Sequence, residues 1–161
     1  METMARVRLL GLGNELLADD AFGIRVAREV HRRLGPGADI VTSSAAGFHL
    51  LDDIVGAEHL VVVDTVQTGS ARPGALRILH EDQVRPMPDG SPHFLGLFDV
   101  LRAARKLGLQ VPADVTIIAV EASDCITVGG TMHPDVEAAI DQAVELSGRL
   151  LRVDEACRAR S

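Results

Sequence analysis

Two aspartates and one histidine stand in this sequence where they could bind a metal ion together. Asp20 follows a glycine-containing turn at residues 11–14, Asp64 directly follows the apolar run 60–63, and His93 stands at the expected start of a helix. Carboxylate oxygens and an imidazole nitrogen suit nickel, zinc or ferrous iron, and three protein ligands leave coordination positions open for water or a substrate. These residue types therefore predict a metal site with room for a bound molecule.

Each of these residues also has an ordinary structural interpretation. Asp20, like Asp19 before it, could cap the N-terminus of the next helix, which is the commonest use of such a residue. Asp64 could cap the loop after its strand or lie exposed at the rim of the sheet, and His93 could be a hydrogen-bonded surface histidine. A metal site is favoured only if the fold brings the three side chains to one place.

The pattern of apolar residues predicts strands that alternate with helices. Strands are expected at 7–10, 39–42, 58–64, 75–79 and 115–120, the third ending at Asp64. Helices are expected at 20–34, at 48–55, from Pro92 with Ser91 as its cap, and from Pro134 onward. The strand at 75–79 is polar on one side, which is typical of an antiparallel edge, and residues 122–132 are expected to form a loop.

Such an alternation predicts a three-layer α/β/α fold, in which a mostly parallel, twisted sheet of about five strands has helices on both faces. Ligands in these folds bind at the carboxyl ends of the strands. Because Asp20 and Asp64 follow the first and third strands and His93 begins a helix, we expect all three to face one crevice. The helix dipole disfavours imidazolium at His93, and a metal binds the neutral imidazole.

Length and composition predict a single domain over residues 1–161 with a frayed tail at 154–161. The net charge of −7 argues against a nucleic-acid surface, because phosphate binding depends on clustered cations. The apolar runs are too short for the roughly 20 residues of a membrane span, and the N-terminus lacks a signal-peptide pattern. With Cys125 and Cys157 expected as free thiols, we expect a cytoplasmic protein. We interpret the clustered arginines as one exposed helix face: Arg25, Arg28, Arg32 and Arg33.

Other motif-like features are not expected to be functional. The glycines at 11 and 13 begin like a dinucleotide-binding fingerprint, but Leu16 takes the place of the third glycine and no acid ends the second strand. Cys125 lies in a loop that could reach the crevice, yet no histidine is paired with it to make a catalytic thiol. His133 is expected to begin a helix, and no serine lies in a GxSxG elbow. Surface or hydrogen-bonded roles are expected for His31, His49, His59 and His80.

Three segments resemble motifs of the hydrogenase maturation proteases. Residues 11–23, GLGNELLADDAFG, are similar to the opening motif GxGNxLxxD(D/E)xxG of that family, and VVVD at 61–64 resembles its apolar strand ending in Asp. The segment SPHFLGLFDVL at 91–101 resembles the family's SPHxLGLxDVL. The segments occur in the family's order, and the resemblance covers nearly the whole chain. One departure is Thr42-Ser43-Ser44-Ala45, where the family commonly carries an Asp in a glycine-rich stretch such as DGGT.

The resemblance implies an endopeptidase that removes the C-terminal extension from the large-subunit precursor of a nickel-iron hydrogenase after nickel insertion. It also implies that Asp20, Asp64 and His93 recognise nickel already bound in the immature subunit. The metal would then come with the substrate rather than stay in the protease, although other divalent ions could occupy the site. The departure at 42–45 implies altered contacts with the substrate. We expect the protein to act as a monomer.

Three other functions fit part of the sequence. A peptidyl-tRNA hydrolase also opens with a strand followed by GLGN, but Asp19-Asp20-Ala21 replaces the Asn and His that its chemistry needs, and the net charge is wrong for tRNA. A zinc aminopeptidase would hold its own metal in the site, which the metal content of the purified protein would reveal. A non-catalytic docking or metal-sensing module would leave a nickel-loaded precursor uncut.

Overall fold

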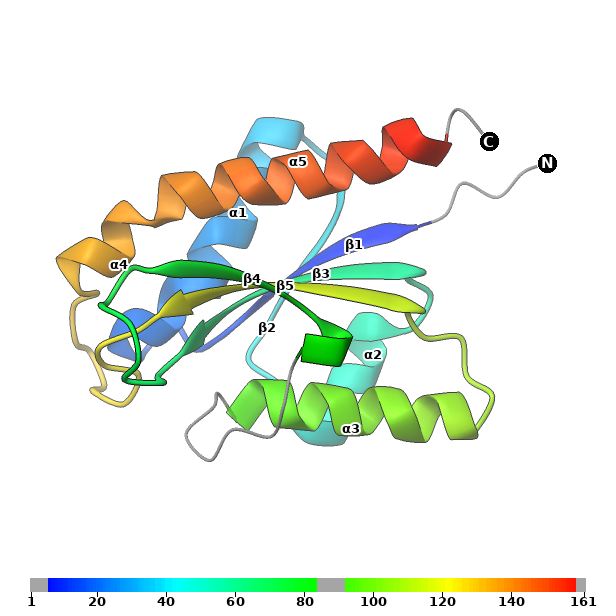
Figure 1. Ribbon diagram of the computed structural model, residues 1–161, viewed down its shortest axis with the longest axis horizontal. Coiled ribbons are helices and arrows are strands. Elements are labelled where there is room, and N and C mark those ends of the chain that lie inside the picture. The colour runs from blue at the N-terminus through cyan, green and yellow to red at the C-terminus, as the bar shows by residue number, and fades with distance from the viewer. Residues whose placement is uncertain (1–5, 84–91, 159–161) are drawn as a thin grey trace.

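The computed structural model describes residues 6–83 and 92–158, with side chains except at 92–95 and 153–158. At its centre is a five-stranded sheet with the strand order β2-β1-β3-β5-β4 (Figure 1). Its strands are β1 (Val7–Leu12), β2 (Asp39–Ser43), β3 (His59–Val66), β4 (Leu76–His80) and β5 (Asp114–Glu121). All neighbouring strands are parallel except β4, which pairs antiparallel with β5 at one edge. The expected mostly parallel sheet and its antiparallel edge are confirmed.

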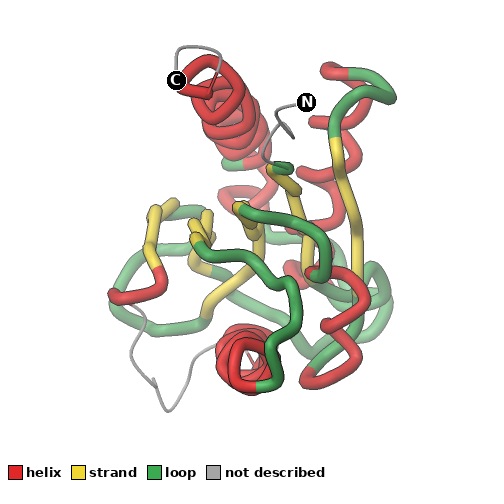
Figure 2. The backbone as a smooth tube through the Cα atoms, turned by 90° about the vertical axis from the view of Figure 1, so that its right-hand side faces the viewer, coloured by secondary structure: helices red, strands yellow, loops and turns green. Residues whose placement is uncertain are grey.

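Helices cover both faces of this sheet, as the two views in Figures 1 and 2 show. One face carries α1 (Phe22–Leu34) and α5 (Ile140–Arg158), with the short α4 (Pro134–Ala138) preceding α5. The other face carries α2 (Leu51–Ile54) and α3 (Pro92–Lys106). Short 3-10 helices are η1 (Ala18–Ala21), η2 (Gly47–Leu50) and η3 (Glu81–Gln83). Within the described ranges, the chain has no helix with the length and apolarity needed to cross a membrane.

The side chains of β3 alternate between two apolar clusters. Val61 and Val63 pack with α1 and α5, for example against Val26. Val62 and Val66 pack with α3, for example against Leu97. Every residue of β3 is buried, as expected for a parallel strand that is covered on both faces. The residues at the carboxyl end of β3, which include Asp64, are therefore held in place by the core on both faces of the sheet.

Two glycines allow α1 to cross β1 at close range. A Cβ on Gly11 would collide with the carbonyl oxygen of Gly23, and a Cβ on Gly23 would collide with the carbonyl oxygens of Leu12 and Val63. Glycine alone lacks this atom, so only glycine permits this approach of the helix to the strands. The close approach fixes η1, which immediately precedes α1, at the carboxyl ends of β1 and β3.

Some element boundaries differ from those expected. The third strand does not end at Asp64, because its ladder with β5 continues through Thr65 to the pair of Val66 and Glu121. The last helix is divided at Ala139 into α4 and α5. α5 continues to Arg158, past the expected start of a tail at residue 154, and residues 159–161 lie outside the described residues. α3 begins at Pro92 as expected, while Ser91 lies outside the described residues.

Candidate functional site

Within the described side chains, four carboxylates are buried: Asp19, Asp20, Asp64 and Glu121. All four lie at the carboxyl edge of the sheet, in η1 after β1, near the end of β3 or at the end of β5. A buried carboxylate is stable only when it is hydrogen-bonded, paired with a cation or bound to a metal. The partners of each carboxylate therefore distinguish structural acids from candidates for chemistry.

Asp19 is a structural acid, and its alternative interpretation as a helix cap is wrong. Neither η1 nor α1 has a side-chain hydrogen bond at its N-cap, which is Leu17 or Ala21 respectively. The fully buried carboxylate of Asp19 instead accepts backbone N–H groups at 2.6 to 2.9 Å, from Ser123, Asp124 and His133. These bonds attach the turn after β1 to the loop between β5 and α4.

Glu121 has a similar structural role on the other side of the site. Its carboxylate accepts the backbone N–H groups of Thr68 at 2.7 Å and Gly69 at 2.9 Å, together with the hydroxyl of Thr68 at 2.8 Å. These bonds hold the turn that follows β3. Asp20 and Asp64 are the two buried acids that remain as candidates for chemistry.

The glycine turn after β1 holds Asp20 in place. Gly13 has a φ of 147°, and a Cβ at Gly13 would collide with the carbonyl oxygen of Asp20. The N–H of Asn14 donates to that carbonyl oxygen at 3.2 Å. The carboxylate of Asp20, which is 6% exposed, accepts a hydrogen bond from the hydroxyl of Thr65 at 3.2 Å. The glycine motif thus places Asp20 against the end of β3, and the helix-cap interpretation is wrong for Asp20 as well.

Asp64 is fully buried within β3, so the interpretation of an exposed acid at the rim is also wrong. It pairs with Ala119 in the ladder, and its Oδ1 accepts the backbone N–H of Thr65 at 2.7 Å. Side chains alternate along a strand, which places Asp64 on the same face as Val62 and Val66. Those valines pack against α3. Asp64 therefore lies on the face of the sheet that α3 covers.

His93 lies in the first turn of α3, and its imidazole lies outside the described side chains. The start of α3 is at the carboxyl edge of the sheet, where β3 and β5 end (Figure 1). The backbone of Gly96 approaches that of Gly47, which follows β2, so closely that a Cβ on Gly96 would lie 2.8 Å from the nitrogen of Gly47. The backbone of His93 is therefore at the expected edge, and its contact with Asp20 and Asp64 stays a prediction. Among the described side chains, no three His, Cys, Asp or Glu form a metal-binding group.

Thr65 and Cys125 lie beside the two candidate acids, and the sequence did not indicate Thr65. The Thr65 hydroxyl donates to Asp20 and accepts from the Sγ of Cys125 at 3.5 Å, while the Thr65 N–H donates to Asp64. Burial raises the pKa of the Cys125 thiol to about 12, with a further contribution from Asp20 and the other nearby carboxylates. A thiol with this pKa is protonated at neutral pH and is a poor nucleophile. Whether Cys125 takes part in catalysis stays a prediction of the sequence.

Three large apolar side chains are exposed on the loops beside this site. Leu16, Ile126 and Val128 are 67%, 82% and 75% exposed. A β-bridge joins Leu17 to Val128, and the N–H of Gly129 donates to the carbonyl oxygen of Leu16 at 2.7 Å. We call Leu16, Ile126 and Val128 the apolar rim. Grouped exposed apolar side chains next to a polar site are typical of a surface that binds another molecule.

The other histidines have the structural roles expected of them. His59 is buried with its Nε2 3.2 Å from the hydroxyl oxygen of Thr116. His133 begins α4, where its Nδ1 accepts the N–H of Asp135 at 3.2 Å. The exposed histidines are His31, His49 and His80.

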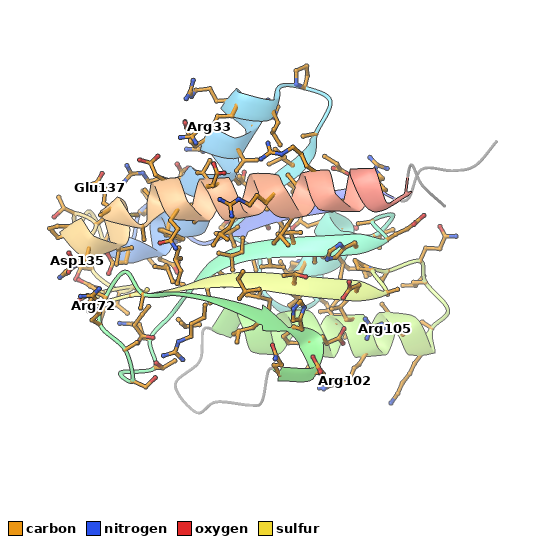
Figure 3. The ribbon with its side chains drawn as sticks, turned by 45° about the horizontal axis from the view of Figure 1, so that its top comes forward. Arg33, Arg72, Arg102, Arg105, Asp135 and Glu137 are labelled. Atoms are coloured by element: carbon orange, nitrogen blue, oxygen red, sulfur yellow. The ribbon has the colours of Figure 1, made fainter. Side chains whose placement is uncertain are left out.

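The arginines of α1 form the expected solvated helix face. Arg32 and Arg33 both donate to Glu29, and these hydrogen bonds lower the pKa of Glu29 to about 2. Arg25 pairs with Glu137 at 2.9 Å. Figure 3 shows Arg33 and Glu137 on the outside of the layer formed by α1, α4 and α5. These cations are paired with acids and do not form a basic surface patch.

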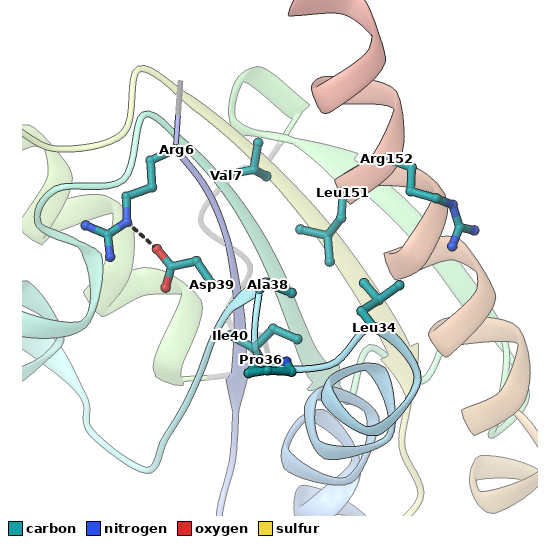
Figure 4. A pocket seen from close by; sticks show the side chains of 10 residues that line it. Arg6, Val7, Leu34, Pro36, Ala38, Asp39, Ile40, Leu151 and Arg152 are labelled. Atoms are coloured by element: carbon teal, nitrogen blue, oxygen red, sulfur yellow. Dashed lines mark hydrogen bonds and ion pairs between the residues drawn. The ribbon is translucent and has the colours of Figure 1, made fainter. Parts of the chain in front are cut away.

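A hollow of about 710 Å³ lies at the opposite edge of the sheet (Figure 4). It is lined by residues from the starts of β1 and β2 and from α5, including Val7, Ile40 and Leu151. An ion pair between Arg6 and Asp39 at 2.7 Å lies in its wall. None of the predicted site residues lines this hollow, so its size does not indicate the site of chemistry.

Comparisons with known proteins find similarity to hydrogenase maturation proteases. The family model described as HycI, hydrogenase maturation protease, matches residues 24–149. The hydrogenase 2 maturation protease of Escherichia coli K12 is 35% identical over 144 residues, which are 87% of each chain. The hydrogenase expression/formation protein HoxM of Cupriavidus necator is 32% identical over 149 residues, covering 89% of this chain and 72% of that protein. The structure of the hydrogenase maturating endopeptidase HybD from E. coli has a TM-score of 0.78 at 33% identity, covering 91% of this chain and 92% of that chain.

Together, the fold and these similarities define an enzyme that hydrolyses peptide bonds. The chain belongs to the hydrogenase maturation protease family and is an endopeptidase that processes the precursor of a hydrogenase large subunit. This assignment confirms the resemblance seen in the sequence. It replaces the three alternatives, which were a peptidyl-tRNA hydrolase, a zinc aminopeptidase and a non-catalytic module. The matched segment includes Asp64 and His93 but begins after Asp20. The assignment of Asp20 to the site therefore depends on its motif and on its contact with Thr65.

Proposed function

We propose that this protease removes the C-terminal extension of a nickel-iron hydrogenase large-subunit precursor after nickel insertion, and that Asp20, Asp64 and His93 recognise the nickel in that precursor. The observation that supports this most directly is the contact of both buried carboxylates with the single residue Thr65. Two acids from different elements are thereby hydrogen-bonded to the same residue near the carboxyl edge. The start of α3 brings a histidine to the same edge.

The donor set suits nickel that is already partly coordinated by the substrate. Imidazole nitrogen and carboxylate oxygen can complete the coordination of a divalent ion whose remaining ligands come from another protein. Binding the ion fixes the position of the precursor, which holds the scissile peptide bond close to an activated water or a polarised carbonyl. Nickel is in this proposal part of the substrate, and other divalent ions could take its place in the isolated protease.

The apolar rim is proposed to contact the precursor next to the metal. Its three side chains belong to the loops that carry the Asp19–Asp20 turn and Cys125, and they are exposed in the protease alone. An apolar stretch of the precursor would bury these side chains and add binding energy that does not depend on nickel. Binding would then have a metal-dependent and a metal-independent part.

We also propose that residues 1–161 form one domain that acts as a monomer in the cytoplasm. A second subunit is not needed to complete the pair of carboxylates, because Asp20, Asp64 and Thr65 all belong to one chain. Size-exclusion chromatography with light scattering tests the monomer directly. A stable dimer would contradict it.

The function is tested by incubating the protease with nickel-loaded and nickel-free precursor and measuring the product masses. We expect the nickel-loaded precursor alone to lose its C-terminal extension. Asp64→Asn and His93→Ala should stop this cleavage while circular dichroism shows an intact fold. Asp141→Asn and His31→Ala are matched controls, because both side chains are exposed on the outer helices α5 and α1. Equal cleavage of nickel-free precursor, or normal cleavage by Asp64→Asn, would contradict the proposal.

A further inference from the structure

We propose that Thr65 is a positioning residue, which fixes Asp20 and Asp64 relative to each other so that they grip one metal ion. This inference rests on the proposed function and adds a residue to its machinery. Thr65 is 2% exposed and hydrogen-bonds to both carboxylates. Its hydroxyl holds the acid from η1, and its backbone N–H holds the acid from β3.

The hydrogen bonds of Thr65 run in one direction. A hydroxyl has a single proton, so the proton given to Oδ1 of Asp20 cannot also be given to Cys125. The S–H of Cys125 must therefore be the donor in the 3.5 Å contact with Thr65 Oγ1. The chain of bonds leads from Cys125 through Thr65 to Asp20. The thiol orients the hydroxyl, and the hydroxyl orients the carboxylate.

Packing alone does not account for a threonine at this position. Thr65 lies in a buried strand, where valine has nearly the same shape and leaves no hydroxyl to satisfy. Val61 and Val63 fill the two preceding positions on the same face of β3. A buried hydroxyl is tolerated here because both of its hydrogen-bonding functions are used. Its contribution is therefore orientation of a neighbouring carboxylate.

Residues that orient metal ligands have measurable effects on metal affinity. Their removal typically weakens metal binding or activity by about 10- to 100-fold, since the ligand keeps its chemistry but loses its fixed direction. Thr65→Val removes the hydroxyl and keeps the shape, whereas Thr65→Ser keeps the hydroxyl and removes only a methyl group. The two substitutions separate orientation from packing.

The test measures the affinity of each purified protein for Ni²⁺ alone by calorimetry, together with the rate of precursor cleavage. Thr65→Val should bind Ni²⁺ about 10- to 100-fold more weakly than the natural protein and cleave correspondingly slowly, and Thr65→Ser should recover both to within about threefold. Thr116→Val is the matched control, because Thr116 is a buried threonine of the adjacent strand whose hydroxyl contacts His59 instead. Thermal unfolding checks that each variant is folded. If Thr65→Val does not fold, Thr65→Ala takes its place with the same expectation.

The outcomes for Thr65 and for the proposed function are distinguishable. Unchanged Ni²⁺ affinity and cleavage in a folded Thr65→Val protein overturn the positioning role, whatever the natural protein does to the precursor. An equal loss in Thr65→Ser and Thr65→Val also overturns it, because the hydroxyl would then not be the cause. If the natural protein binds Ni²⁺ but leaves the nickel-loaded precursor uncut, the proposed function fails while the Ni²⁺ affinities still decide the role of Thr65.

Discussion

The carboxylate of Asp19 accepts the backbone N–H of His133 at 2.6 Å, which joins the turn before α1 to the start of α4. Asp20, the next residue, instead accepts the hydroxyl of Thr65 at 3.2 Å. Two adjacent acids of the same motif thus have different partners, backbone amides for one and a side chain of β3 for the other. We expect them to respond differently to the same substitution.

Asp19→Asn is predicted to destabilise the fold, and Asp20→Asn is predicted to stop cleavage. An amide at position 19 replaces one acceptor oxygen with an N–H donor that faces backbone N–H groups, which should cost about 2 to 4 kcal/mol in the free energy of unfolding. An amide at position 20 can still accept from Thr65, so its cost should stay below about 1 kcal/mol while the charged ligand is lost. Urea unfolding and precursor cleavage measure the two effects. Equal destabilisation by both substitutions would contradict a structural role for Asp19 and a chemical role for Asp20.

The apolar rim is predicted to affect substrate binding but not the chemical step. Ile126→Ser combined with Val128→Ser should raise the KM for nickel-loaded precursor by roughly three- to tenfold and leave kcat unchanged, because lost contacts of this kind weaken bound states uniformly. Both side chains are largely exposed, so the melting temperature should not change. Leu107→Ser is the control, since Leu107 is 75% exposed just beyond the other end of α3. A fall in kcat without a change in KM would argue against the rim as a docking surface.

Gly23→Ala is predicted to be severely destabilising. The added Cβ would collide with the carbonyl oxygens of Leu12 and Val63, and neither strand can move without disrupting the sheet. Overpacking of this kind costs about 3 kcal/mol or more. Gly148→Ala in α5 is the matched control, because its nearest atom would be the flexible guanidinium of Arg152 at 3.5 Å. We expect it to raise stability by about 0.5 to 1 kcal/mol through helix propensity. Denaturant unfolding of both variants checks this contrast, which fails if Gly23→Ala is as stable as the natural protein.

The thiol of Cys125 is predicted to react slowly in the folded protein. Burial raises its pKa from an ordinary value of 9.0 to about 12, so little thiolate exists at pH 8. In a Cys157→Ser background, iodoacetamide should modify the folded protein at least tenfold more slowly than the urea-unfolded chain, in which the thiol has its ordinary pKa. The folded state holds the thiol proton of Cys125 more tightly than the unfolded state does. The contribution of this proton to the free energy of unfolding is therefore complete below about pH 9, and it falls as the pH rises toward 12. Rapid labelling of the folded protein at pH 8 would contradict the claim that burial raises the pKa of the Cys125 thiol.

The alternation of apolar segments was sufficient to predict where Asp20 and Asp64 lie. Parallel strands end at a common edge, and this rule brought two residues far apart in the sequence to one place before any side chain was considered. The roles of the glycines at 11, 13 and 23 could not be derived in the same way, because they depend on how closely α1 crosses the sheet. That distance is a property of the packed structure.

The end of β3 and the hydrogen-bond partners of Asp19 and Asp20 also could not be predicted from the sequence. β3 continues past Asp64 because Thr65 and Val66 find ladder partners in β5, which local propensity does not reveal. Asp19 and Asp20 look identical as helix caps, and only the folded loop between β5 and α4 gives Asp19 its amide donors. The positions of Asp20 and Asp64 near the carboxyl edge were thus predictable, whereas their hydrogen-bond partners were not.

The most direct test of the central claim is a crystal of this protease soaked with Ni²⁺, with the ion located by anomalous scattering. The account predicts one ion at the carboxyl edge of the sheet, with carboxylate oxygens of Asp20 and Asp64 and an imidazole nitrogen of His93 all at about 2.0 to 2.2 Å. An ion bound elsewhere, or one bound at this edge without Asp64 and His93, would contradict it.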